Sequence, residues 1–455
     1  MGTTNVRGAG PWALLAICMG YFMVILDTTI VNAALPALRA DLGADVTGLQ
    51  WVVDGYMLVL AAGLLSGGAL ADLLGARRVC QWGLVAFVVA SIACGAAPNL
   101  PVLIAARILQ GVGAALAVPA SLALLRAANP DRQARARAVG IWGGVAGGAA
   151  AAGPILGGLL VGLVGWESVF LVNVPIGLAA CWLIARTVPA PEPRPRGLDL
   201  VGQVLAALAL TALTVALIEH THVGVAVVSA AVFLVAGVAF VLAQRRAKDP
   251  MLPLSLFRDA TLSAGTAVGL LINLGFYGEL FVLNLYLQEP RHLSALVAGL
   301  ALLPQMGMAA IGSALSGRYT AATGGPRRTM LVGLLIGAAG LLGLMIAGEH
   351  TAYLWLVLPL VATGFGMSFT MPAATTAVTD AAPDDRAGLA AGVINAARQL
   401  GSVLGVAILG GLAGHGAGLV PGMRVALAVA GAAFLLAAVL TAVGVRHHAE
   451  DSLHA

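Results

Sequence analysis

The sequence predicts an all-α integral membrane protein, and three observations lead to this fold class: its composition, its long apolar runs and an internal repeat. Of the 455 residues, 60% are hydrophobic and 10% are charged, and the mean hydropathy is +0.96. That leaves too little polar surface for a water-soluble domain. The runs reach the roughly 20 apolar residues that a membrane-crossing helix needs. They are continuously apolar rather than alternating, so we expect helices and not a barrel.

Fourteen apolar segments are separated by short polar connectors, and each is expected to form one transmembrane helix. The first is longer than the core of a signal peptide and has no convincing small-residue cleavage site, so we interpret it as a retained first helix. The segments lie near 12–36, 50–71, 79–97, 101–125, 137–162, 168–187, 199–218, 223–243, 261–288, 294–316, 329–347, 352–378, 388–412 and 423–445.

The 24 lysines and arginines are distributed unevenly between the two sides of the expected membrane. One side holds only Arg39, Arg291 and Arg424, Arg107 and Arg398 fall within spans, and the connectors of the other side hold all the rest. By the positive-inside rule both termini are expected in the cytoplasm, which requires an even number of spans. The net charge of +4 is spread over helix ends rather than gathered in one patch, so no nucleic-acid partner is expected.

An internal repeat divides the chain into two similar halves. Eight residues recur at a constant spacing of 253: Gly111, Gly113, Pro119, Pro130, Asp131, Gly148, Gly157 and Gly158 match Gly364, Gly366, Pro372, Pro383, Asp384, Gly401, Gly410 and Gly411. The halves are 11–187 and 261–446, with six spans each in parallel orientation, and 188–260 holds a Pro- and Arg-rich linker and two additional spans. Parallel six-helix halves around a central site describe a secondary transporter of the major facilitator type.

The segment 140–158, GIWGGVAGGAAAAGPILGG, is made almost entirely of glycine, alanine and other apolar residues. Gly144 and Gly148 follow Gly140 at four-residue spacing, on one stripe of a helix. In a bilayer such a stripe indicates a face pressed against a neighbouring helix, and Pro154 is expected to bend the segment. We interpret the segment as a sliding and sealing surface; the alternative is a tightly packed helix with no part in function.

Four motifs carry a resemblance to a known family. They are LDTTIVNAALP at 26–36, GGALADLLGARR at 67–78, RILQGVGAA at 107–115 and the Gly-Pro-x-x-Gly-Gly of 153–158. In these motifs the chain resembles the fourteen-span drug:proton antiporters of the major facilitator superfamily, over essentially its whole length. It departs from the family pattern at Glu167 and Ser168, where the family mostly has Arg and Trp, and this affects only the extracellular ion pairing expected there.

The resemblance implies a set of residues that control conformational change. Asp72, at a cytoplasmic helix end, is expected to pair with an arginine or to cap the next half-helix, and so to latch one conformation. The residues expected to act in gating are Asp72, Gly75, Arg77, Arg78, Gly144, Gly148, Gly153, Pro154, Gly157 and Gly158.

Two arginines lie inside spans, where a charge is costly and usually faces a polar cavity or a carboxylate. For Arg107 we favour a functional pairing in proton coupling over simple snorkelling to the membrane surface. For Arg398 a role at the interface of the halves and a role in substrate binding both remain open.

Three carboxylic acids inside spans are candidates for coupling and recognition. Low dielectric disfavours the charged form of Asp27, Asp54 and Glu279, while a nearby cation favours it, so each is able to exchange a proton. We assign proton coupling to Asp27 and Asp54, and substrate binding to Asp27, Glu279, Asn32 and Arg398. The alternative for each acid is a permanently neutral or paired structural role.

The leading hypothesis is a proton-driven exporter of lipophilic, cationic or aromatic drugs in a bacterial cytoplasmic membrane. The alternatives are a narrow exporter of one metabolite, such as a self-made antibiotic, and a non-transporting membrane sensor. No phosphate-binding loop or catalytic constellation is visible, so neither a cofactor nor an enzyme is expected, and the proton gradient is the expected energy source. We expect a monomer.

Cys18, Cys80, Cys94 and Cys181 are interpreted as packing residues, and His220, His222 and His415 as solvated residues rather than metal ligands.

Overall fold

The computed structural model describes residues 10–129, 131–189, 199–219, 221–247, 250, 252–383, 387–414 and 418–445. Within this part of the chain, fourteen segments are long and apolar enough to cross a membrane, and the regular structure is entirely helical. The all-helical fold and the number of spans predicted from the sequence are therefore confirmed. The expectations for Pro130, His220, Asp384 and His415, and for the basic residues at 194, 196, 248, 386 and 446, concern positions outside the described residues.

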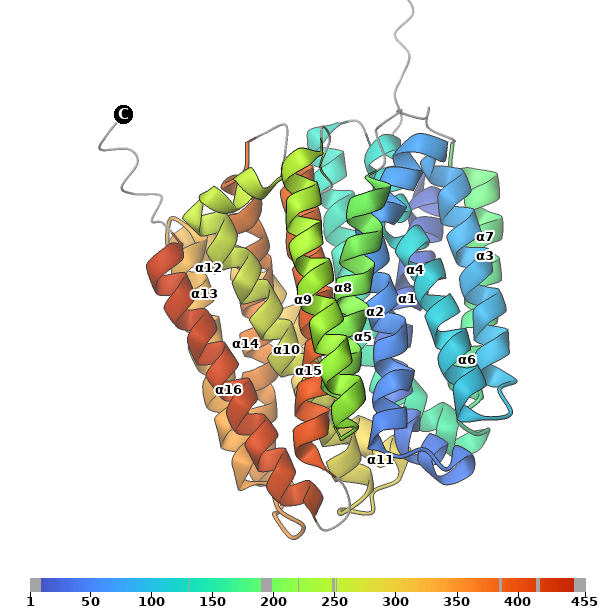
Figure 1. Cartoon of the computed structure of the whole chain (residues 1–455), viewed down its shortest axis with the longest axis vertical. Coiled ribbons are helices and arrows are strands. Elements are labelled where there is room, and N and C mark those ends of the chain that lie inside the picture. The colour runs from blue at the N-terminus through green and yellow to red at the C-terminus, as the bar shows by residue number, and fades with distance from the viewer. Residues whose placement is uncertain are drawn as a thin grey trace, which may run out of the picture.

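The helices fall into two groups separated by an extra pair (Figure 1). We call the first group the N-terminal bundle: α1 (Pro11–Leu42), α2 (Val46–Leu74), α3 (Ala76–Gly95), α4 (Leu100–Ala128), α5 (Arg132–Leu163), α6 (Ser168–Leu171) and α7 (Asn173–Thr187). The extra pair is α8 (Leu200–Ile218) and α9 (Val223–Arg246). We call the last group the C-terminal bundle: α10 (Ala260–Gln288), α11 (Ala295–Ala301), α12 (Leu303–Ala322), α13 (Pro326–Gly343), α14 (Leu354–Asp380), α15 (Ala387–Ala413) and α16 (Leu419–Gly444).

Two predicted spans are interrupted near one end. The sixth span is divided at Val172 into α6 and α7, and the tenth is divided at Leu302 into α11 and α12. Pro175 and Pro304 lie just after the breaks, and a proline has no N–H to donate to the preceding turn. By contrast, α5 continues through Pro154 as one helix.

Short polar side chains fix where several helices begin. Asp45 accepts a hydrogen bond from the Gly48 N–H at 2.8 Å, and Asp259 accepts one from the Leu262 N–H at 2.9 Å. Asn99 caps α4 in the same way. Each of these caps satisfies a backbone donor that has no partner inside its helix.

The same helix pairings occur in both bundles. In the N-terminal bundle α1 packs on α5, and α4 packs on α2 and α3; in the C-terminal bundle α10 packs on α15, and α14 packs on α12 and α13. Arg77 donates to the carbonyl of Ala185 on α7, and Arg327 donates to that of Ala442 on α16. Arg77 and Arg327 therefore occupy matching places in the packing of the two bundles.

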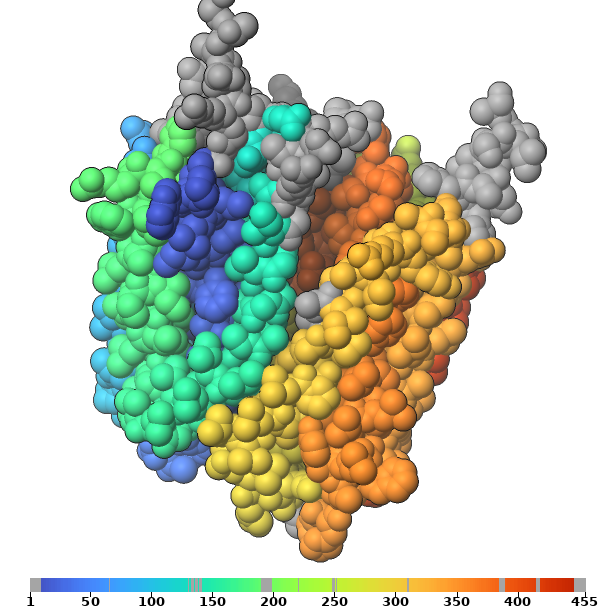
Figure 2. All heavy atoms as spheres, turned by 180° about the vertical axis from the view of Figure 1, so that it is seen from behind, coloured from blue at the N-terminus to red at the C-terminus, as the bar shows by residue number. Residues whose placement is uncertain are grey.

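The bundles touch at one end of the molecule and separate toward the other. The helix α1 begins and α16 ends at the same end (Figure 1). We call this the terminal end, and the opposite end the closed end. Figure 2 shows α5 in contact with α11 and α12 toward the closed end, and a hollow between the bundles toward the terminal end. The helix α8 packs on α2 and α15, and α9 packs on α8.

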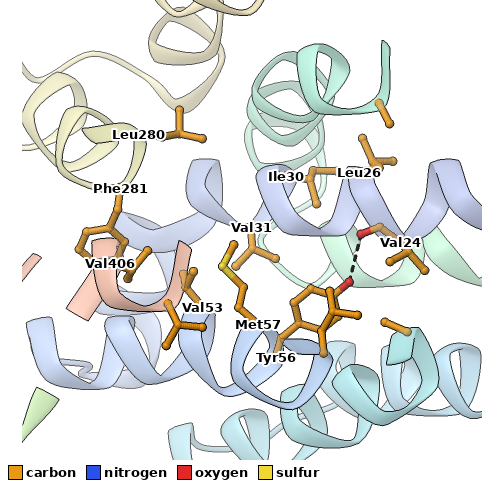
Figure 3. Close-up of a cluster of buried hydrophobic side chains, with 14 of the residues drawn as sticks. Val24, Leu26, Ile30, Val31, Val53, Tyr56, Met57, Leu280, Phe281 and Val406 are labelled. Atoms are coloured by element: carbon orange, nitrogen blue, oxygen red, sulfur yellow. Dashed lines mark hydrogen bonds between the residues drawn. The ribbon is translucent and has the colours of Figure 1, made fainter. Parts of the chain in front are cut away.

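A buried apolar cluster joins the bundles. Figure 3 shows side chains of α1, α2, α10 and α15 meeting there, among them Val31, Val53, Phe281 and Val406. In the same view the Tyr56 hydroxyl donates to the Val24 carbonyl at 3.1 Å. The two bundles are therefore in direct apolar contact at this cluster.

Candidate transport site

A buried ion pair lies inside the N-terminal bundle. Arg107 of α4 binds the carboxylate of Asp27 on α1, and their side chains are 1% and 0% exposed. Gln110 and Asn173 also donate to Asp27 Oδ1, at 3.2 and 2.9 Å. Both carboxylate oxygens are therefore hydrogen-bonded, which is what a charge in low dielectric requires.

The guanidinium of Arg107 is also held by α2. Its Nε donates to the Val52 carbonyl at 2.8 Å, and its Cζ lies 4.4 Å from the centre of the Tyr56 ring. A cation over an aromatic face is attracted by the ring's quadrupole. The ion pair thus connects α1, α2, α4 and, through Asn173, α7. The prediction that Arg107 is paired rather than snorkelling agrees with this geometry.

Two other acids are buried without a partner. The side chains of Asp54 on α2 and Glu279 on α10 are 0% and 1% exposed, and none of their carboxylate oxygens has a hydrogen-bond partner within the described residues. Thr363 and Gln305 are polar neighbours of Glu279 but are not in hydrogen-bonding geometry. Because burial without a partner is costly for a charge, the neutral, protonated form is favoured at both positions.

An aromatic group lies between the bundles. The rings of Tyr21 on α1 and Trp142 on α5 stack at 3.6 Å with an angle of 6° between their planes. Trp142 Nε1 donates to Ser121 Oγ at 3.3 Å. Tyr277 of α10 lies beside Thr28 of α1, on the opposite bundle.

Sequence reasoning missed these aromatic residues. The seven-residue spacing of Tyr21 and Thr28, with Asn32 four residues further, places all three on one face of α1, and Asp27 on a different face. That periodicity was a usable signal for Tyr21. Nothing in the sequence indicated that Trp142 and Tyr277 approach this face.

Among the four predicted substrate contacts, only Arg398 is partly exposed. It packs between α15 and α10, since a Cβ placed on Gly269 would lie 3.4 Å from its Cγ. Asp27 and Glu279 are buried within their own bundles, and the amide of Asn32 donates to carbonyls of its own helix at 3.3 and 3.4 Å. In this conformation the side chains of those three residues are therefore buried, and their predicted roles in substrate binding stay predictions.

The glycine stripe of α5 changes character along the helix. A Cβ on Gly157 would lie 2.7 Å from the Ile30 carbonyl oxygen, and one on Gly158 would lie 2.5 Å from Leu296 Cα of α11. Gly153 is equally close to Thr29. At Gly144 and Gly148 no atom lies within 4 Å. The expectation that the Gly144 and Gly148 face presses on a neighbour is wrong for this conformation, because here the bundles have diverged; the close packing belongs to the closed end.

Polar contacts across the bundles reinforce the closed end. Arg39 of α1 pairs with Glu289, the residue that follows α10, at 2.6 Å. Gln50 of α2 donates to the carbonyls of Val406 and Ala407 on α15, both at 3.0 Å. These contacts hold this end shut.

At the terminal end, the turn between α2 and α3 consists of Gly75 alone. Its φ of 95° lies in the region that favours glycine. Asp72 makes no hydrogen bond or ion pair with Arg77 or Arg78 and does not cap α3; the charge that acts with it is Arg126 of α4. In this conformation neither Arg77 nor Arg78 is therefore the partner of Asp72, and its role as a latch stays a prediction.

His222 lies within 3.2 Å of Glu219 and is largely exposed. Glu219 also accepts a hydrogen bond from Trp51 Nε1 at 2.9 Å, which ties the α8–α9 turn to α2. The four cysteines are free, and three are buried, as expected of packing residues. No cluster of three metal-ligating side chains occurs in the described part of the chain.

Comparisons with known proteins agree with this architecture. The chain matches the Major Facilitator Superfamily over residues 17–406 and 324–453. It is 38% identical to the methylenomycin A resistance protein of Bacillus subtilis (strain 168), covering 96% of this chain and 94% of the relative. It is 39% identical to the tetracenomycin C resistance and export protein of Streptomyces glaucescens, covering 90% and 76%.

A solved structure shares the fold at low sequence identity. A POT family transporter in complex with a thioalcohol-conjugated peptide superposes with a TM-score of 0.72 and 15% identity, covering 94% of each chain. At that identity the likeness concerns the fold alone. Taken with the relatives, it shows that this chain belongs to the Major Facilitator Superfamily, close to its fourteen-helix drug-resistance exporters, and is a multi-pass membrane transporter rather than an enzyme.

Proposed function

We propose that this protein exports lipophilic, aromatic drugs or antibiotics from a bacterial cell in exchange for protons. The observation that carries the proposal is the stacked pair of Tyr21 on α1 and Trp142 on α5, in one bundle, together with Tyr277 on α10 of the other bundle, which lies beside Thr28 of α1. Aromatic faces bind flat apolar compounds with little demand for a particular substituent. The resistance and export functions named for the relatives support the direction of transport.

The two bundles would alternate around this site. With both termini in the cytoplasm, as the arginine distribution predicts, the hollow opens inward and accepts drug from the cell. Opening outward then requires the Arg39–Glu289 pair, the Gln50 contacts and the Gly158 contact to separate. The functional units of this motion would be 11–187 and 261–446, joined by 188–260, within one monomer.

Proton coupling is assigned to Asp27 through Arg107. A proton on Asp27 neutralises the carboxylate and weakens its pull on the guanidinium, which is also bound to the Val52 carbonyl. Val52 lies two residues from Gln50, which holds α15. Protonation would thereby alter a contact between the bundles, and the drug would be released as the proton is taken up.

The unpartnered acids would contribute differently. Asp54 lies in the half of α2 that is nearer the closed end, one helical turn deeper than Gln50, and is placed to exchange protons with the outside once that end opens. Glu279 would adjust the proton affinity of the C-terminal bundle. The sequence led us to expect a cationic or aromatic substrate. A cationic substrate would need carboxylates that face it, and the three acids are paired or buried. The proposal therefore keeps only the aromatic part of that expectation.

The test is the accumulation of fluorescent aromatic compounds in a bacterial host whose own drug exporters are deleted. Cells that express the protein should accumulate less rhodamine 110 or fluorescein than cells without it, and an uncoupler should abolish the difference. Asp27→Asn, produced in equal amount in the membrane, should behave like the empty host. Equal accumulation of every aromatic compound tested, with and without the protein, would refute export.

The orientation needs its own measurement. A single cysteine introduced at Gly10, where an added Cβ meets no atom within 4 Å, in a variant that lacks the four native cysteines should be shielded from a membrane-impermeant maleimide in intact cells. A cysteine at Glu219 should react. Labelling from outside at Gly10 would reverse the direction assigned to the hollow.

A further inference from the structure

The charge balance near the middle of the spans leaves one uncompensated group. Asp27 and Arg107 neutralise each other. Asp54 and Glu279 are buried and lack partners within the described residues that would stabilise their charged forms. The remaining charged side chain is Arg398 of α15, which is partly exposed.

Arg398 is held in place but is not satisfied. Its Nη1 donates to Asn395 Oδ1 of the same helix at 3.2 Å, while its Nε has no hydrogen-bond partner within the described residues. No carboxylate of the described residues forms an ion pair with it. A guanidinium has five N–H donors in a planar fork that matches a carboxylate or a sulfonate. This arginine therefore presents unused donors in a low-dielectric setting.

Two residues of the aromatic group lie near this cation. Tyr21 and Tyr277 lie close enough to Arg398 for its charge to act on both phenol groups, although they come from different bundles. Tyr21 is fixed by its stack on Trp142, and Tyr277 packs edge-on to Phe276 at 5.6 Å. A flat ligand between these rings would bring an attached anionic group to Arg398.

We propose that the central site selects aromatic compounds that carry an anionic group, with Arg398 as the counter-charge and Tyr21, Trp142 and Tyr277 as the aromatic walls. This rests on the proposed export function and specifies its substrate class. It reverses the charge preference expected from the number of acids in the spans, because those acids are paired or buried while the arginine is not.

The experiment compares two dyes that share a xanthene ring and differ in charge: fluorescein, an anion at pH 7.5, and rhodamine 110, a cation. Binding to the purified full-length chain in nanodiscs of neutral lipid is measured by fluorescence anisotropy, with empty nanodiscs as background. The wild type should bind fluorescein more tightly. Arg398→Gln should weaken fluorescein binding by roughly tenfold or more, since it removes a charge-assisted hydrogen bond, and should leave rhodamine 110 within about twofold. Arg398→Lys should keep part of the fluorescein affinity.

Two further variants separate charge from shape and from general effects. Tyr277→Leu should weaken both dyes to a similar extent, because it removes a wall and no charge. Arg186→Gln removes an equal charge from the outside of α7, where Arg186 lies over Trp182, and should change neither dye. A cooperative thermal unfolding transition shows that each variant is folded. If Arg398→Gln does not fold, the test rests on Arg398→Lys, which should bind fluorescein more weakly than the wild type and rhodamine 110 equally well.

Preference for rhodamine 110, or an equal loss of both dyes in the Arg398 variants, would overturn the anionic preference. If rhodamine 110 is then still exported from cells, the proposed function stands and only the substrate class is wrong. If no aromatic dye is bound or exported, the proposed function itself fails.

Discussion

The N-terminal and C-terminal bundles pair their helices in the same way but bury different charges. In the repeat, the position that matches Arg107 is Leu360, so the C-terminal bundle has no counterpart of the Asp27–Arg107 pair. It has instead Glu279, without a partner, and Arg398, which matches Val145 of α5. The repeated positions are mostly small residues that set helix packing, whereas the positions that differ carry the ionisable groups. The residues that set the helix packing of the transporter are thus shared by the two bundles, and the ionisable residues that would bind protons and substrate are not.

The largest expected effect comes from breaking the pair in the N-terminal bundle. Arg107→Gln leaves Asp27 as a buried carboxylate without its cation, which costs about 3 kcal/mol of stability. We expect a lower thermal unfolding temperature in detergent and no drug export. The measurement is the unfolding temperature of purified protein together with dye accumulation in cells.

The matched control is the double variant Asp27→Asn with Arg107→Gln. It removes both charges, so stability should return toward that of the wild type while export stays absent. If the double variant were less stable than Arg107→Gln alone, the two residues would not act as a pair.

An intermediate effect is expected from the acids that have no partner. Asp54→Asn and Glu279→Gln delete no ion pair and replace a neutral carboxyl group by a neutral amide of similar size, so stability should change by less than about 1 kcal/mol. Proton release on substrate binding to purified protein should disappear in Asp27→Asn. It should persist in both other variants, with a displaced pH profile in Asp54→Asn. Normal proton release from Asp27→Asn would transfer coupling to one of the unpartnered acids.

The sequence was sufficient for the scaffold and insufficient for the site. Continuous apolar runs and the positions of turns predicted all fourteen spans, because in a bilayer each span must satisfy its own backbone hydrogen bonds. The breaks at Val172 and Leu302 were not predicted, although the prolines that follow them could have indicated them. Tyr21, Trp142 and Tyr277 could not be assembled from the sequence, since they come from α1, α5 and α10. Their proximity depends on how the two bundles are placed against each other.

The last comparison concerns the packing at one glycine position in each bundle. Gly148 of α5 has no neighbouring atom within 4 Å, whereas a Cβ on its repeat partner Gly401 would press on the Leu270 carbonyl of α10. Gly148→Ala should be neutral or stabilise the protein by up to about 1 kcal/mol, through helix propensity. Gly401→Ala should destabilise it by about 1 to 3 kcal/mol, through overpacking. Unfolding temperatures of the two purified variants check the difference.

A larger side chain at the open position distinguishes packing from motion. Gly148→Leu fits the open hollow, so membrane insertion and stability should be kept. If the bundles close on this stripe when the opposite end opens, the leucine blocks that approach and export stops, and Gly144→Leu should behave alike. Wild-type export by both variants would mean that the bundles never meet along this part of α5. The sliding surface on this stripe would then be confined to Gly158, which touches α11 of the other bundle, since Gly153 and Gly157 pack on α1 of their own bundle.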